Sequence, residues 1–152
     1  MSANEPFDPL LWHDNALHAF RIEAGADGMG ELVLDIDHIV EWLPPLPGTT
    51  TYRFRVAPAE LRFHEASDLV VTLDYTAPRF ALLPMTLHDT QRTPRTFPNG
   101  YRSFDWTMTL SCPHDGQIRF SAVGYSQRLL APPVETDQPS LSPKRRPRCW
   151  QR

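Results

Sequence analysis

The sequence predicts an all-β protein, built as an antiparallel sandwich or a partly closed barrel of about seven or eight strands, with a disordered C-terminal tail. Three observations lead to this prediction. Apolar and polar residues alternate along most of the chain, which is the period of a strand with one buried face. Turn-forming residues separate the alternating stretches at short intervals. Sixteen prolines among 152 residues also break the chain too often for long helices.

The first two strands are predicted to form a hairpin around a glycine-rich turn at residues 24–30. Before the turn, the residues that alternate inward are Ala16, His18, Phe20 and Ile22. After the turn, the inward residues are Leu32, Leu34 and Ile36. Residue i should then face the residue numbered about 54 minus i. This register places His18 near Ile36 and His38 near Ala16, so the two histidines are expected to lie close together.

The rest of the chain supplies further alternating stretches. Prolines between residues 44 and 47 end the second strand. More strands are then expected at residues 52–56, 61–64, 69–75, 80–90, 99–112 and 117–129. Asp115 and Gly116 suit a hairpin turn between the last two of these. Cys112 shares a face with Trp106, which predicts an unreactive, packed thiol.

One domain is expected over residues 8–131, followed by a proline-rich, basic and largely disordered tail at residues 132–152. Apolar residues become sparse in this tail, which contains the basic run Lys144–Arg148. The N-terminus lacks a basic segment followed by an apolar one, and no apolar run approaches the roughly 18 residues of a membrane span. We therefore expect a cytoplasmic protein without membrane contact.

Charge is distributed unevenly along the chain. Residues 1–50 contain nine acidic residues and one basic residue, Arg21, whereas residues 51–131 contain nine arginines and seven acidic residues. We expect the acidic strands to pair with arginine-bearing strands of the same sheet rather than with an external charged ligand. The acidic N-terminal third and the net charge of −3 argue against nucleic acid binding by the folded body.

Motifs of several common enzyme classes are missing from the sequence. It contains no glycine-rich phosphate loop that ends in lysine, no Gly-x-Ser-x-Gly nucleophile motif and no Cys-x-x-Cys pair. The sequence therefore assigns no catalytic residue, no metal ligand and no cofactor.

Histidine next to a carboxylate is the one suggestive pattern, as in His13-Asp14 and Asp37-His38. Neighbouring residues of a strand point to opposite faces, so such pairs do not converge on a metal within a strand. In loops they are typical of turns and caps, because Asp accepts backbone N–H bonds. His18 and His38 fall on the predicted apolar face. There they are either core histidines bonded to backbone carbonyls or a pH-sensitive or ligand-facing pair.

An acidic stripe is expected on the outward face of the second strand, formed by Glu31, Asp35, Asp37 and Glu41. Its alternation with core residues predicts that the stripe faces solvent, and that Arg53 or Arg55 of the next strand neutralises it. Trp12 and Trp42 flank the acidic hairpin. Exposed tryptophan beside proline loops is typical of protein interfaces, although buried packing is its more frequent fate.

Several segments together resemble a family of uncharacterised bacterial proteins. The segments are Leu11–Arg21, Gly30–Trp42, Arg55–His64, Ser67–Leu69, Gly124–Leu130 and Pro133–Ser142. That family carries no established activity, so the resemblance assigns no residue a role. The Trp-His-Asp opening before a strand is also similar to small all-β immunity proteins that neutralise bacterial toxins. This second likeness implies a binding function.

We therefore expect a non-catalytic binding protein of the immunity or accessory type, whose acidic, tryptophan-flanked face contacts a basic protein such as a nuclease toxin. The residues expected at this face are Trp12, His13, Asp14, His18, Asp35, Asp37, His38, Glu41 and Trp42. The alternative is a metal-dependent or small-molecule enzyme with His13, His18 and His38 gathered at one end of the β-domain. A homo-oligomer completed by shared strands is a third hypothesis.

Overall fold

The computed structural model describes residues 7–76 and 81–142, and within these ranges the chain forms nine β-strands and no helix. All nine strands belong to one antiparallel sheet, so the predicted all-β antiparallel fold is confirmed. In chain order they are β1 (Ala16–Ala24), β2 (Gly30–Leu43), β3 (Arg53–His64), β4 (Ser67–Thr72), β5 (Met85–Thr96), β6 (Arg102–Cys112), β7 (Gln117–Ala122), β8 (Gly124–Leu129) and β9 (Val134–Thr136). No helix long and apolar enough to cross a membrane occurs among the described residues.

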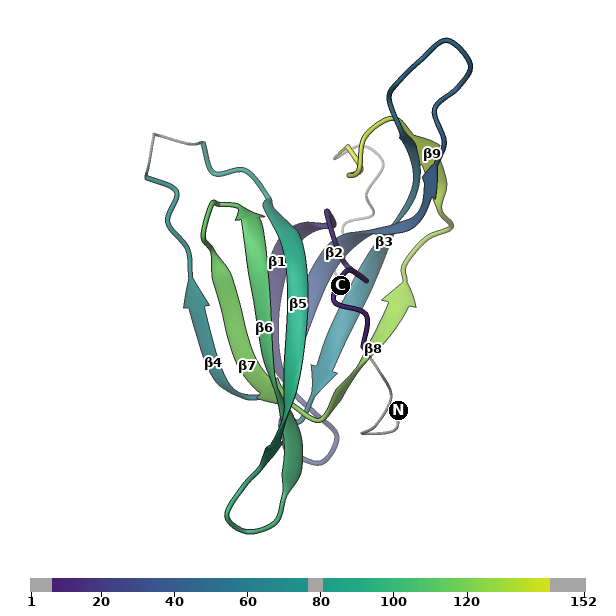
Figure 1. Cartoon of the computed structure of the whole chain (residues 1–152). Coiled ribbons are helices and arrows are strands. Elements are labelled where there is room, and N and C mark those ends of the chain that lie inside the picture. Colours follow the sequence, from purple (N-terminus) through teal and green to yellow (C-terminus); the bar gives the residue numbers. More distant parts are fainter. Residues whose placement is uncertain (1–6, 77–80, 143–152) are drawn as a thin grey trace.

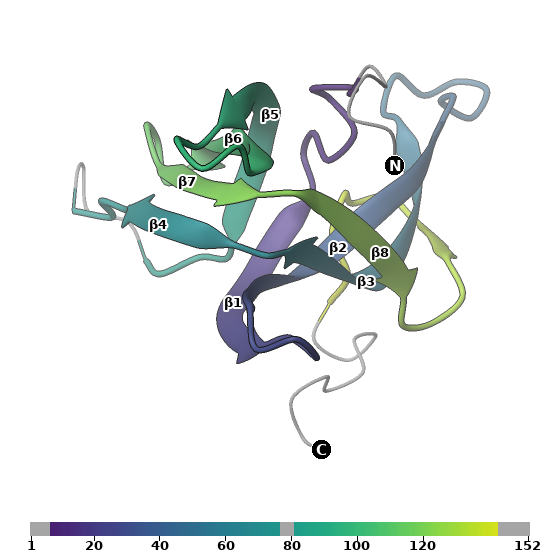
Figure 2. The ribbon, with the colours of Figure 1, turned by 90° about the horizontal axis from the view of Figure 1, so that it is seen from below.

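The sheet is strongly curved but is not closed into a barrel (Figure 1). Its strand order is β4-β7-β6-β5-β1-β2-β3-β8, and β9 pairs with the far end of β3. In the described chain only two residue pairs, Ala16–Thr86 and Leu17–Met85, join β1 to β5. Figure 2 shows the result, in which β4-β7-β6-β5 and β1-β2-β3-β8 form two halves that face each other across the core.

The segment 117–129, predicted as a single strand, forms two strands in different parts of the sheet. β7 lies between β4 and β6, whereas β8 pairs with β3 at the opposite edge. The chain crosses over at Val123, whose N–H donates to the carbonyl oxygen of His64 at 3.0 Å. The chain passes from one half of the sheet to the other without a loop. The alternation of apolar and polar residues therefore continues through Val123, and the sequence does not show where β7 ends and β8 begins.

The β1–β2 hairpin has the predicted register over most of its length. Phe20 faces Leu34 and Ala24 faces Gly30, as expected. The register shifts between Leu17 and Ala19, so that His18 lies in a β-bulge. A bulge adds one residue and changes which side chains point inward. Leu17 is therefore buried, and the prediction that His18 shares a face with Phe20 is wrong.

Aromatic residues from both halves of the sheet fill the core. Phe63 of β3 contacts Trp106 of β6 and Phe120 of β7, with ring centroids 5.0 Å and 4.6 Å apart. A buried Phe contributes roughly 1.5–3 kcal/mol relative to an exposed one. Contacts of this kind hold the two halves together where few backbone bonds join them.

The segment before β1 closes the gap that the bend between β1 and β5 leaves. Thr90 donates its N–H to Pro9, Asp14 donates to Leu87, and Leu87 donates to Asn15, at 2.9–3.0 Å. Asp14 has φ of 63°, a left-handed conformation that Asp tolerates better than most residues. We refer to residues 12–15 as the plug, because they fill this end of the sheet.

Part of the segment that is predicted as a largely disordered tail from residue 132 packs on the sheet. Residues 134–136 form β9, in which Thr136 faces Phe54 of β3. Leu141 is buried, and its N–H donates to Asp37 Oδ2 at 3.0 Å. The packed part of the chain therefore continues past the predicted domain end at residue 131. The basic run at 144–148 lies outside the described residues.

Candidate binding surface

Trp12 is a core residue, so the prediction that it flanks an exposed face is wrong. Its side chain is 1% exposed, and its indole N–H donates to Gln127 Oε1 at 2.8 Å. The rings of Phe7, Phe63 and Tyr125 lie 5.1–5.9 Å from it. Trp12 fills the space at the bend of the sheet, a position that local alternation does not indicate.

His13 and Asp14 belong to the turn that precedes β1, as their turn chemistry predicts. His13 Nδ1 donates to the carbonyl oxygen of His88 at 2.7 Å, and the two imidazole rings lie 5.3 Å apart. Asp14 Oδ2 lies 3.5 Å from His13 Nε2. Both side chains are partly exposed, so they form the outer surface of the plug.

His18 forms a hydrogen-bonded pair with Asp37 across the hairpin, with Nε2 and Oδ2 2.8 Å apart. Asp37 is fully buried, and it also accepts the N–H of Leu141. Asp35 is buried as well. The prediction that these two carboxylates face solvent is therefore wrong. The chain beyond β9 returns over Asp37, and strand alternation alone does not reveal such a cover.

His38 lies on the apolar face, as predicted, but its partner is a side chain rather than a backbone carbonyl. Asn15 Nδ2 donates to His38 Nδ1 at 2.9 Å, and Asn15 Oδ1 accepts the N–H of Ile39 at 3.1 Å. Burial lowers the pKa of His38 below its ordinary value of 6.5. His18 and His38 thus bond to different partners on opposite faces of the hairpin. The predicted histidine pair does not form.

Asn15 is a residue that the sequence prediction missed. Its side chain is fully buried, and its two polar atoms join the plug to β2. A buried amide costs free energy unless it is hydrogen-bonded, so this arrangement fixes how the plug meets the sheet. The sequence feature that could have indicated Asn15 is its position directly before an apolar strand.

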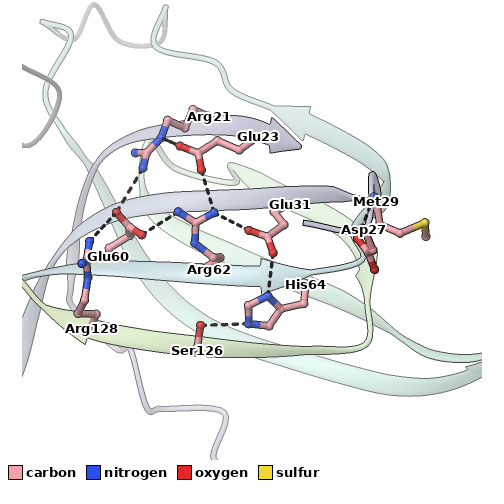
Figure 3. Close-up of polar contacts among 10 residues, drawn as sticks. All are labelled: Arg21, Glu23, Asp27, Met29, Glu31, Glu60, Arg62, His64, Ser126 and Arg128. Carbon is pink, nitrogen blue, oxygen red and sulfur yellow. Dashed lines mark hydrogen bonds and ion pairs between the residues drawn. The ribbon is translucent and has the colours of Figure 1, made fainter. Parts of the chain in front are cut away.

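A network of ion pairs covers the outer face of β1, β2 and β3 (Figure 3). Arg62 stands at its centre and donates to Glu23, Glu31 and Glu60. Hydrogen bonds from Arg62 and from His64 hold the pKa of Glu31 below its ordinary value. The predicted internal pairing of acidic and arginine-bearing strands is confirmed here. These carboxylates are consequently neutralised by an arginine of the same chain.

Glu41 is the member of the acidic stripe that is well exposed, and Arg55 neutralises it as predicted. Arg55 Nη1 lies 3.4 Å from Glu41 Oε2, and about half of each side chain is exposed. Arg53 pairs instead with Glu135 of β9, at 2.6 Å. Burial and ion pairing together replace the continuous acidic face that the sequence predicts.

The far ends of β2 and β3, with the loop between them, project beyond the rest of the sheet (Figure 1). We refer to residues 40–55 as the arm. Trp42 is 46% exposed there, and its ring packs edge-on against Phe54 and Tyr52 at 5.0 Å and 6.4 Å. The other exposed apolar side chains of the arm are Val40, Leu46 and Tyr52. The exposure predicted for a flanking tryptophan therefore holds for Trp42.

A second, smaller core fixes the base of the arm. It consists of Ile39, Phe54, Val56 and Leu141. β9 lies alongside and pairs with β3 at residues 54–56. At the tip, Thr49 donates its N–H to Leu46 at 3.0 Å, and Gly48 adopts φ of 82°, which glycine allows. The arm therefore presents Trp42 from a supported hairpin.

The described residues offer no cluster that could hold a metal ion, because they contain no suitable group of three or more His, Cys, Asp or Glu side chains. His64 joins Glu31 and Ser126 in one hydrogen-bonded chain. His13, His18 and His38, which the enzyme hypothesis gathers at one end, each bond to a different group. Cys112 is half-buried. The candidate binding surface among the described residues is therefore the aromatic cluster on the arm.

Comparisons with known proteins add no assignment. No family model matches the chain, and no curated protein and no solved structure matches it. The resemblances to a bacterial family and to toxin-immunity proteins therefore stay predictions.

Proposed function

We propose that this protein is a non-catalytic binding protein with an immunity-type or accessory role, and that it contacts another protein through the arm. The observation that carries the proposal is the half-exposed Trp42 in an aromatic cluster on a projecting hairpin (Figure 1). Tryptophan and tyrosine offer large contact areas with few rotatable bonds, and they are enriched at the energetic centres of protein interfaces.

The charges around this cluster support an apolar contact. Glu41 is paired with Arg55, and Glu135 is paired with Arg53. These pairs leave the rim of the cluster close to neutral, and burial removes Asp35 and Asp37 from the surface. A partner would therefore offer an apolar groove or pocket to Trp42. Basic character of the partner, which the sequence predicts, is not required by this surface.

The construction of the arm also supports binding. Three prolines between residues 44 and 47 restrict the loop, and the small core with Leu141 supports its base. A surface that is ordered before binding loses less conformational entropy when a partner arrives. Trp42 can therefore contribute more of its contact energy to affinity than a side chain on a floppy loop.

The test is capture of partners from the cells of origin with the tagged full-length chain, with Trp42→Ala and Tyr101→Ala as variants. Tyr101 is a matched control, because it is a partly exposed aromatic on the β5–β6 hairpin, which projects at the opposite end (Figure 1). An aromatic hot spot contributes about 2 kcal/mol or more, which is roughly a 30-fold change in affinity.

We expect a captured protein to bind the wild-type chain and Tyr101→Ala alike in titrations with purified components, and to bind Trp42→Ala at least about 30-fold more weakly. Circular dichroism establishes that both variants are folded. A partner whose affinity is unchanged by Trp42→Ala, or is lost in Tyr101→Ala alone, would show that the arm is not the binding surface.

A further inference from the structure

β1 has an open edge along most of its length. Among the residues that the structure describes, β5 pairs with β1 only at Ala16 and Leu17. Pro84 directly precedes β5 and has no N–H to continue the ladder. Residues 19–24 then pair with β2 on one side, and their other side has no described strand beside it.

The hairpin shows which backbone groups lie at this edge. Gly25 donates its N–H to Met29 at 2.6 Å, and in an antiparallel ladder every second residue bonds to the same neighbour. Arg21 and Glu23 therefore direct their N–H and C=O groups towards β2. The residues that direct these groups outward are Phe20, Ile22 and Ala24. A further strand could pair with them.

The side chains at this edge favour such a strand. Ile22 is 71% exposed in the middle of the edge. Beside it opens an apolar pocket of about 150 Å³ whose lining includes Ile22, Leu32, Leu69 and Phe120. Natural edge strands usually carry a proline, a lysine or a bulge that blocks pairing. Residues 19–24 contain no proline, no lysine and no bulge, and their two charged residues, Arg21 and Glu23, have opposite signs.

The two terminal strands of the sheet differ from β1 in this respect. β4 has a register shift between Ser67 and Val70, and Asp68 within it adopts φ of 56°. β8 presents mainly polar side chains, among them Ser126, Gln127 and Arg128. Bulges and charged side chains obstruct the addition of a strand. The regular edge of β1 is therefore the better template.

We propose that β1 pairs with β1 of a second copy of this chain, antiparallel about a two-fold axis at Ile22. In an antiparallel pair, residues directly opposite each other point to the same face of the sheet. The two-fold axis must therefore pass through a residue of β1, which then lies opposite its own copy. Within one chain Arg21 pairs with Glu23 and Glu60, and Glu23 also pairs with Arg62. An axis at Ile22 adds a pairing between chains, because it places Arg21 opposite Glu23 of the second copy and Glu23 opposite its Arg21. Axes at Arg21 or at Glu23 instead place like charges opposite each other. Charge complementarity thus selects both the partner and the register.

The same register completes the apolar side of the edge. Ile22 would pack on Ile22 of the second copy, and Phe20 would lie opposite its Ala24. These contacts cover the exposed isoleucine and the mouth of the apolar pocket. They lie on β1 and not on the arm, so the dimer is independent of the partner binding proposed above.

The first test measures the mass of the full-length chain by size-exclusion chromatography with light scattering, over a concentration series up to the solubility limit. We expect the wild-type chain to reach the dimer mass and Ile22→Lys to stay at the monomer mass. Val70→Lys is the matched control, because Val70 is an exposed apolar residue on the β4 edge. It should dimerise like the wild type.

The second test examines the register by exchange of charge between chains. Arg21→Glu alone places two glutamates opposite each other, and Glu23→Arg alone places two arginines opposite each other, so each variant should lose the dimer. An equimolar mixture restores opposite charges at both positions and should form a heterodimer. Charge changes within one chain cannot produce this rescue, so the mixture separates dimer contacts from effects on folding.

Three outcomes would overturn the proposal. The first is a wild-type chain that stays monomeric at every concentration. The second is a dimer that survives Ile22→Lys or is lost in Val70→Lys. The third is a mixture of the two charge variants that stays monomeric although each variant is folded by circular dichroism.

Discussion

The plug and the arm each contain one tryptophan, and the two tryptophans have opposite environments. Each carries a tryptophan next to an acidic or titratable residue and close to proline, Trp12 after Pro9 and Trp42 before Pro44. Trp12 is 1% exposed, whereas Trp42 is 46% exposed.

The difference comes from what distant parts of the chain place over each ring. Trp12 is covered by Phe63 and Tyr125 and bonds to Gln127. Trp42 is contacted by the rings of its own hairpin. The local sequence thus does not determine whether a tryptophan is buried in the core or exposed for contact with a partner. That outcome depends on long-range strand pairing.

Replacing each tryptophan by alanine tests the two environments and should give the largest effect. Trp12→Ala should lower the free energy of unfolding by about 3–5 kcal/mol, because a large buried ring leaves a cavity. Trp42→Ala should lower it by less than about 1 kcal/mol, because the ring is half in water. Urea unfolding of both variants against the wild type measures the two values. Similar losses in both variants would contradict the assigned environments.

The fold class was predictable because period-two alternation depends on neighbouring residues. The turn at residues 24–30 and the register of Phe20 with Leu34 followed directly from it. The bulge at His18 did not, because one inserted residue reverses the face of every residue before it without changing the composition. A single bulge therefore misplaced His18.

The candidate site was harder to predict than the fold. Asp35 and Asp37 alternate with core residues as solvent-facing side chains do, yet both are buried. Leu141 bonds to Asp37 from more than a hundred residues away. A local sequence pattern cannot show that a distant segment buries these two carboxylates. Glu41 and Arg55 lie on adjacent strands, so their pairing was within reach of the sequence.

A second variant tests what supports the arm. Leu141→Ala should cost about 2–3 kcal/mol, since Leu141 is buried against Ile39, Phe54 and Val56. The loss should be local, because this small core is separate from the aromatic core around Trp12. Hydrogen exchange measured by mass spectrometry should show faster exchange at residues 53–56 and unchanged exchange in β6. Uniform acceleration along the whole chain would mean that the arm has no separate core.

The smallest effect concerns pH, and it distinguishes the buried polar bonds near the plug from the ion-pair network around Arg62. Burial lowers the pKa of His38 below 6.5, so the unfolded chain takes up this proton at a higher pH than the folded chain does. Stability should be fully present above pH 6.5 and fall as the pH drops from there towards the folded pKa.

Hydrogen bonds from Arg62 lower the pKa of Glu31 below its ordinary 4.5, so its contribution is lost only at more acidic pH. Urea unfolding between pH 7 and the region where carboxylates titrate therefore reports on the histidines, and a variant of His38 separates its share from that of the other five. His38→Asn should flatten the pH dependence in this window, since asparagine can still accept the bond from Asn15 and does not titrate there. His114→Asn is the control, because that side chain is 85% exposed. Equal slopes in the two variants would mean that burial of His38 does not set the pH response.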